Sequence, residues 1–168
     1  MNNIEKNTYV KKQITNALLS LLKSKELKDI SISEVTSAAG VSRVSFYRNY
    51  KEKEDILREY IKRQLTNWMN DNNKQDSSGD ESLGNIFAYL TEYKDIYLLL
   101  SRRNLLYLLK DIIMETFGPK PDHRNFDAYT AAFVANGIYG WIEEWFIRGM
   151  QESGEEMTIL LKNRNMNA

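Results

Sequence analysis

Residues 31–53, SISEVTSAAGVSRVSFYRNYKEK, decide the fold that this chain is expected to adopt. Ser31 and Glu34 have the spacing of a capping box, which predicts a helix over 33–39. Gly40 follows that helix at a position that favours left-handed backbone, and Ser42 is a good N-cap for a second helix over 43–50. Two short helices around a glycine turn are the sequence form of a helix-turn-helix, which places its second helix in the major groove of DNA.

Helical periodicity continues on both sides of this motif. Apolar residues recur at spacings of three and four over 9–24 and over 53–70, whereas the polar stretch 71–82 is predicted to be a loop or linker. Further helices are expected over 83–93, 96–101, 105–117 and 126–150, and a short one after Gly154. The sequence therefore predicts an all-α chain of about nine helices.

The composition is that of a soluble globular protein, with 42% hydrophobic and 27% charged residues in a chain of 168. There is no cysteine, no apolar segment typical of a signal peptide, and no apolar run near the roughly 20 residues that span a bilayer. We therefore expect a cytoplasmic protein with no membrane partner. The single histidine, His123, stands alone and no glycine-rich phosphate loop is present, so we expect no catalytic residue, metal site or cofactor.

The charge of the chain is unevenly distributed although its net charge is zero. Residues 1–68 carry 13 Lys and Arg against 8 Asp and Glu, a net charge of +5, and residues 69–168 carry 10 against 15, a net charge of −5. The positive half contains the helix-turn-helix, and a local positive field attracts phosphates whatever the charge of the whole chain.

Three consecutive residues of the second helix are the candidate base contacts. Arg43 is expected to read a base, because a guanidinium bonds O6 and N7 of guanine together. Val44 is expected to contact a thymine methyl, and Ser45 to add a weaker base or phosphate contact. Phe46 and Tyr50 lie four residues apart and are expected to point into the core.

Other polar residues around the motif are the candidate phosphate contacts. Tyr47, Arg48 and Lys53 are expected to hold phosphates, which position the protein without reading sequence. Ser42 at the helix N-terminus and Ser33 on the preceding helix are expected to contact the same DNA backbone. The alternative is that the arginines are solvated surface charges and that Tyr47 is half-buried packing.

The stretch from Ile14 to Leu57 resembles the TetR family of bacterial transcriptional regulators, including AcrR-like members. The shared patterns are S-x-x-x-V-x-x-x-A-G-V-S, S-F-Y-R-x-Y and K-E-x-I-L. The resemblance implies a three-helix DNA-binding domain over 1–52, a connecting helix over 53–70 and a ligand-binding and dimerising helical domain over 71–168. It matches Tyr47 and Lys53 to the family's tyrosine and basic phosphate positions, whereas Glu52 stands where the family often has Ser or Asn as an N-cap.

A looser resemblance covers residues 131–157, AAFVANGIYGWIEEWFIRGMQESGEEM. This segment is similar to the C-terminal part of short TetR-like regulators, including those related to dihydroxyacetone-kinase regulators. It implies that the last two helices form a four-helix interface with their symmetry mates, so that a homodimer meets a palindromic site. The candidate interface residues are Gly137, Gly140, Trp145, Phe146, Met157 and Leu160.

The second half is also rich in aromatic residues, for which two interpretations stand. They line an effector pocket, as the resemblance implies, or they are the core of a small domain. The candidate pocket residues are Phe87, Tyr93, Tyr97, Tyr107, Phe133 and Trp141.

The sequence and the resemblance together predict a homodimeric regulator that binds double-stranded DNA and responds to a small molecule, more often a repressor than an activator. The alternative hypothesis is a protein-interaction co-regulator that keeps the helix-turn-helix as a scaffold and acts through its C-terminal half.

Overall fold

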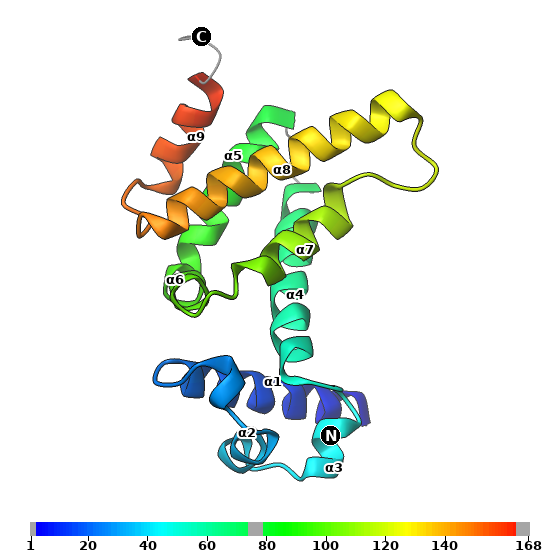
Figure 1. Cartoon of the computed structure of the whole chain (residues 1–168), viewed down its shortest axis with the longest axis vertical. Coiled ribbons are helices and arrows are strands. Elements are labelled where there is room, and N and C mark those ends of the chain that lie inside the picture. Colours follow the sequence, from blue (N-terminus) through cyan, green and yellow to red (C-terminus); the bar gives the residue numbers. More distant parts are fainter. Residues whose placement is uncertain (1–2, 74–78, 164–168) are drawn as a thin grey trace. The chain divides into compact units, whose positions relative to one another are not determined.

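The computed structural model of the protein describes residues 3–73 and 79–163, and the regular structure in these ranges is entirely helical (Figure 1). They contain nine α-helices and one 3-10 turn, which confirms the all-α expectation. The residues up to Ile61 form one compact unit, unit 1, and those from Lys62 onward form another, unit 2. The boundary between the units therefore falls inside a single helix, α4.

Unit 1 is a small helical bundle in which α1 packs on α2 and α2 contacts α3. Its core consists of aliphatic and aromatic side chains that recur at helical spacing, among them Leu18, Val35, Phe46 and Ile56, each fully buried. The elements are α1 (Asn3–Leu22), η1 (Leu27–Asp29), α2 (Ile32–Ala39), α3 (Arg43–Tyr47) and the first part of α4 (Lys53–Asn73).

The ends of two helices differ from the sequence expectation. Helix α1 begins at Asn3 and not near residue 9, although Ile14 is its first fully buried residue. Helix α3 ends at Tyr47 and not at Tyr50, because the amides of Asn49 and Tyr50 both turn back onto the carbonyl of Phe46. Apolar periodicity does not show either end. The first turns of α1 consist of exposed residues, and Tyr50 is buried although it lies beyond the end of α3.

The predicted linker over 71–82 is shorter in the structure. Helix α4 continues to Asn73, and α5 begins at Gly79. Residues 74–78 lie outside the described part of the chain. The stretch contains no proline, so its polar composition alone does not end a helix.

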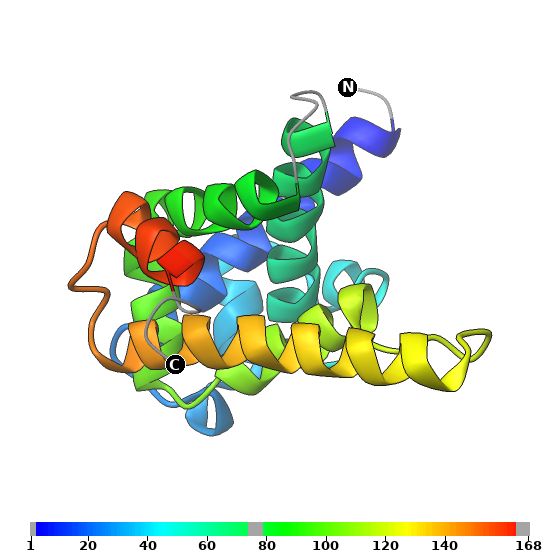
Figure 2. The ribbon, with the colours of Figure 1, turned by 90° about the horizontal axis from the view of Figure 1, so that it is seen from above.

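Unit 2 is built around the long helix α8. Helix α8 packs on α7 and α6, and α9 packs on α5, as both ribbon views show (Figures 1 and 2). Its core contains a chain of aromatic contacts: Phe87 meets Trp145 edge to face at 5.7 Å between ring centroids, and Tyr97 stacks on Phe146 at 5.2 Å. The elements of this unit are the remainder of α4, α5 (Gly79–Glu92), α6 (Lys94–Arg102), α7 (Leu106–Phe117), α8 (Asn125–Ile147) and α9 (Gly154–Asn163).

The corner between α8 and α9 is fixed by two hydrogen bonds, one within the corner and one from α6. The indole nitrogen of Trp145 donates to the carbonyl of Glu152 at 3.1 Å, and Nζ of Lys94 donates to the carbonyl of Met150 at 2.7 Å. Gly149 and Met150 both have positive φ, 82° and 53°, which reverses the chain. The corner leads into α9 at Gly154, which is buried.

Gly154 lies so close to α5 that it has no room for a side chain. A Cβ at this position would approach the backbone nitrogen of Ala88 to 2.7 Å and its Cα to 2.8 Å. The substitution Gly154→Ala is expected to displace α9 from α5 and to lower the free energy of unfolding by about 1–3 kcal/mol, the usual cost of overpacking. Urea unfolding followed by circular dichroism measures this change. Glu155→Ala, at an exposed site in the same helix, is the control, and equal stability of the two variants would contradict the close approach.

Candidate nucleic-acid interface

Local features define both ends of α2. Oγ of Ser31 accepts from the amide of Glu34 at 3.2 Å, and Oε2 of Glu34 accepts from the amide of Ser31 at 2.8 Å. Gly40 follows with φ of 64° and no other atoms near its missing Cβ, so the backbone angle alone requires glycine here. The capping box and the left-handed glycine predicted from the sequence are both confirmed.

Glu34 also joins α2 to the loop that follows α1. Its carboxylate accepts a hydrogen bond from Nζ of Lys25 and two from Ser31. The hydrogen bond from Lys25, followed by those from Ser31, lowers the pKa of Glu34 to about 2. The carboxylate is therefore charged throughout the physiological range and holds the start of α2 in place.

Helix α3 is anchored by its buried side and leaves the other side open. Phe46 is fully buried, and the expectation that Phe46 and Tyr50 both point inward is confirmed, since Tyr50 is only 4% exposed. The helix begins at the N-cap Ser42, whose Oγ accepts from the amide of Ser45 at 3.1 Å. The buried ring fixes the rotation of the helix and hence which residues face solvent.

The open side of α3 carries two adjacent pairs of side chains, one helical turn apart. Val44 and Tyr47 are 60% and 57% exposed, and Arg43 and Arg48 are exposed as well. The guanidinium group of neither arginine forms a hydrogen bond or ion pair with another residue in the described part of the chain. We call this surface the α3 face; it consists of Arg43, Val44, Tyr47 and Arg48.

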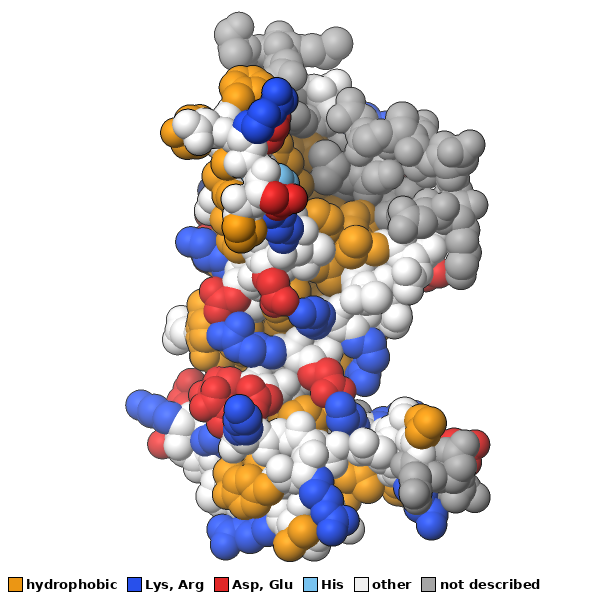
Figure 3. Space-filling view, turned by 90° about the vertical axis from the view of Figure 1, so that its right-hand side faces the viewer, with side chains coloured by type: hydrophobic (Ala, Val, Ile, Leu, Met, Phe, Trp, Pro, Cys, Tyr) orange, Lys and Arg blue, Asp and Glu red, His pale blue; other side chains and the backbone are white. Residues whose placement is uncertain are grey.

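The α3 face combines the groups that DNA recognition uses. Two free guanidinium groups match phosphates or guanine edges, and an exposed valine matches a thymine methyl. The lower part of Figure 3, where α1–α3 of Figure 1 lie, shows Lys and Arg side chains beside exposed hydrophobic ones. None of the four residues of the α3 face is acidic, so none of them would repel an approaching phosphate backbone.

The serines predicted to contact DNA differ in their availability. Ser33 is exposed on α2. The hydroxyl groups of Ser42 and Ser45 form a hydrogen bond, with 3.0 Å between their oxygens, and Ser45 is half-buried. The cap of α3 therefore already uses the hydroxyl groups of both residues.

Lys53 has a structural role that its sequence position does not show. Its Nζ donates to the carbonyls of Leu27 and Ile30, each at 2.5 Å. Two of the three ammonium donors thus bind the η1 turn to the start of α4, and one donor remains for a phosphate.

The start of α4 contains a cap that sequence reasoning missed. Oδ2 of Asp55 accepts from the amides of Lys51 and Glu52, at 2.8 Å and 3.1 Å. An acidic residue three positions after the N-cap is a recognisable signal, and Asp55 stands in that position relative to Glu52. Asp55 therefore caps the start of α4 by accepting from the amides that precede the helix, whichever residue stands at position 52.

The six aromatic residues predicted to line an effector pocket do not surround one cavity. Phe87 and Tyr97 are buried in the core, whereas Phe133 is 81% exposed on α8. Tyr107 lies in a cleft beside α7, Trp141 lies in a groove between α8 and α9, and Tyr93 packs against Tyr89. Of the six, Tyr97 alone lines the central cavity.

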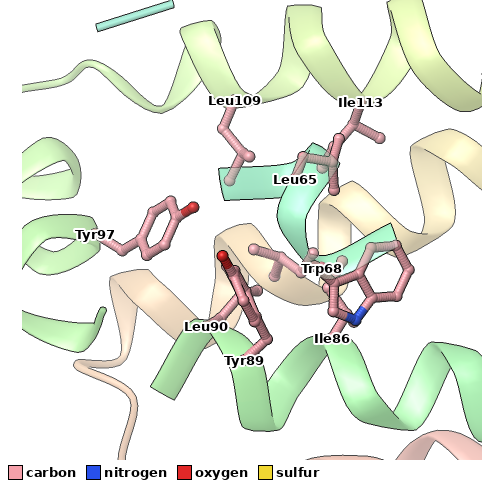
Figure 4. Close-up of a pocket in the computed structure, with 9 residues that line it drawn as sticks. Leu65, Trp68, Ile86, Tyr89, Leu90, Tyr97, Leu109 and Ile113 are labelled. Atoms are coloured by element: carbon pink, nitrogen blue, oxygen red, sulfur yellow. The ribbon is translucent and has the colours of Figure 1, made fainter. Parts of the chain in front are cut away.

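The central cavity of unit 2 is small and apolar. Its free volume is about 10 Å³, room for no more than one water molecule. In Figure 4 the hydroxyl of Tyr97 points toward the middle of the lining side chains. The lining residues are Leu65, Trp68, Ile86, Tyr89, Leu90, Tyr97, Leu109, Ile113 and Ile142.

The predicted dimer residues also divide between core and surface. Gly137, Gly140 and Leu160 are exposed. Trp145 and Phe146 are each 2% exposed and Met157 is 5% exposed, so the core of the same subunit occupies them. These three residues pack within the subunit, and their place at a dimer interface stays a prediction.

Among the described residues, no helix is long and apolar enough to cross a membrane, and no cluster of three or more acidic or histidine side chains could hold a metal ion. What the fold does present is a helix-turn-helix with an exposed basic face, which defines a DNA-binding protein.

Comparison with known families agrees with this class. Residues 14–60 match the family model described as bacterial regulatory proteins, tetR family, and residues 77–164 match one described as transcriptional regulator C-terminal region. The chain belongs to the TetR family of bacterial transcriptional regulators, which are DNA-binding proteins and not enzymes.

Solved structures share the whole fold at low sequence identity. A TetR transcriptional regulator from Streptococcus agalactiae 2603V is 20% identical, with a TM-score of 0.62 over 91% of both chains. A structure described as the dihydroxyacetone kinase operon activator DhaS is 19% identical, with a TM-score of 0.57 over 92% of this chain and 93% of that one. No curated protein matches the chain significantly. Both resemblances seen in the sequence are thus confirmed at the level of family and fold.

The contacts of Lys53 lead to a stability prediction. Lys53→Met removes two charge-assisted hydrogen bonds to buried main chain, so we expect the free energy of unfolding to fall by about 1–3 kcal/mol. Thermal and urea unfolding measure the loss. Lys51→Met, in which an exposed lysine two residues away is removed, should leave stability unchanged. If both variants unfolded like the wild type, the carbonyl contacts of Lys53 would have no structural role.

Proposed function

We propose that this protein is a homodimeric repressor that binds a palindromic operator and releases it in response to a small molecule. The observation that carries the proposal is the α3 face, with two unpaired arginines beside exposed Val44 and Tyr47. A two-fold dimer presents two such faces, and half-sites about one helical turn apart would match them.

The α3 face supports a division between reading and holding DNA. Arg43 comes directly after the N-cap, and the N-terminal residues of a recognition helix contact base edges. Tyr47 and Arg48 lie one turn further on, where they are suited to phosphates at the side of the groove. The third donor of Lys53 and the hydroxyl of Ser33 supply further phosphate contacts in this proposal.

The exposed apolar side of α8 supports the homodimer. Phe126, Tyr129 and Phe133 are 78%, 70% and 81% exposed, and they lie on the same side of the helix as Gly137 and Gly140. An isolated subunit rarely leaves such a stripe open to water. A second copy of α8 covers it well, because the two glycines allow two helices to approach closely.

The central cavity of unit 2 supports the response to a ligand. Leu65 and Trp68, which line it, belong to α4, the helix whose first turns belong to unit 1. Trp68 is only 8% exposed, and its indole N–H has no partner in the described residues. A neutral ligand that accepted this hydrogen bond and opened the cavity would have to move α4, and so would favour one of two states of the DNA-binding unit.

Repression is the proposed direction of control, because a dimer bound over a promoter excludes other proteins from it. A structurally similar protein is described as an operon activator, so a reporter assay with the selected operator decides the direction.

Selection of bound sequences from random DNA is expected to yield a palindrome. Arg43→Ala should relax preference at one base pair of each half-site, by about 1–3 kcal/mol, whereas Arg48→Ala should weaken binding to all sequences equally. Titrations at several salt concentrations should give a slope that becomes shallower by about one for the loss of one phosphate contact. Failure to enrich any sequence, with neither variant altering affinity, would favour the co-regulator hypothesis instead.

The dimer is tested by placing a charge on the apolar side of α8. Phe133→Asp is expected to yield a monomer by sedimentation velocity and to reduce affinity for the full palindrome to that for a half-site, because an unpaired carboxylate at the interface must be desolvated. Ile4→Asp, at another exposed apolar position, is the control. A Phe133→Asp protein that remained dimeric would place the interface elsewhere.

A further inference from the structure

A second, larger hollow lies on the surface of unit 2, between the turn after α6 and the helices α7 and α8. It has a volume of about 410 Å³, within the usual range for small-molecule sites. None of its lining residues belongs to the α3 face, to the exposed apolar side of α8 or to the lining of the central cavity. Its polar lining consists of Ser101, Asn104, Tyr107, Lys110, Tyr139 and Glu143.

The cleft contains two opposite charges that both lie next to one buried ring. Tyr139 is 6% exposed, and its hydroxyl donates to Oε1 of Glu143 at 2.5 Å. Nζ of Lys110, on α7, lies 5.5 Å from the centroid of the same ring. Tyr139 therefore fixes the position of the carboxylate and provides a surface over which the ammonium group sits.

Within the described part of the chain, neither charge has a partner of opposite sign. Lys110 and Glu143 form no ion pair with each other, and the described residues provide no other ion pair for either of them. The remaining oxygen of Glu143 and the three donors of Lys110 are thus available to a ligand. Burial of Tyr139, together with the carboxylate of Glu143, raises the pKa of Tyr139, so its hydroxyl stays protonated and keeps donating to Glu143.

We propose that this cleft binds a small zwitterion, such as a free amino acid, with its ammonium group on Glu143 and its carboxylate on Lys110. A simple anion would pair with Lys110 but would be repelled by Glu143, and a simple cation would meet the reverse arrangement. An uncharged ligand would leave both charges without a partner of opposite sign. A zwitterion satisfies both ends at once, and its apolar part contacts Tyr107 and Tyr139.

Isothermal titration calorimetry on the full chain, without DNA, tests the proposal. The probes are glycine, β-alanine and γ-aminobutyrate, whose charges are progressively further apart, with acetate, ethylammonium and glycerol for comparison. At least one zwitterion is expected to bind saturably, and acetate, ethylammonium and glycerol about tenfold more weakly or not at all, as expected for loss of one charge-assisted contact.

Two variants remove one charge each without removing packing. Glu143→Gln keeps an oxygen that accepts from Tyr139, and Lys110→Met keeps an unbranched chain of similar length. Each is expected to weaken binding of the zwitterion about tenfold, while Glu155→Gln and Lys162→Met, at exposed sites on α9, should not change it.

Three results would overturn the proposal: no binding of any zwitterion, equal binding of acetate or glycerol, or unchanged affinity in both cleft variants. The titration involves no DNA, so its result is independent of operator binding. A failure of the zwitterion proposal is therefore distinguishable from a failure of the proposed function.

Discussion

The burial of Phe46 in the core of unit 1 is the interaction on which the DNA-binding surface depends. Helix α3 has only five residues, and a helix of that length is not stable in water by its own hydrogen bonds. Its position is set by the fully buried ring of Phe46, which contacts Tyr47 edge to face and lies against Tyr50. Once that ring is inside, the arginines at 43 and 48 must face outward.

In unit 2 the long helix α8 has the central role, because its different sides contribute to the core, to an exposed apolar surface and to the charged cleft. Ile142, Trp145 and Phe146 fill the core, and Phe126 and Phe133 lie exposed on the opposite side. Between these two sides, Tyr139 and Glu143 face the charged cleft next to α7. A helix that is apolar nearly all round in sequence thus separates, in the structure, into a core side, a surface suited to a second copy and the wall of a polar site.

The parts of the site that could be predicted from the sequence are those made by near neighbours in the chain. The capping box of Ser31 and Glu34, the left-handed Gly40 and the inward direction of Phe46 all follow from spacings of a few residues. The cap formed by Asp55 belongs to the same class and could have been found by the same spacing. In contrast, periodicity does not tell a core aromatic such as Phe87 from an exposed one such as Phe133.

By itself, the sequence determined the family, the helical class and the side of α3 that faces solvent, because helix caps, glycine turns and apolar periods act over one or two turns. Only the tertiary structure decided the partners of Lys53, whose ammonium binds carbonyls 26 and 23 residues earlier in the chain. It also decided which aromatic rings fill the core and that Lys110 and Glu143 share a cleft. Those outcomes depend on how distant helices approach each other, and no local pattern contains that distance.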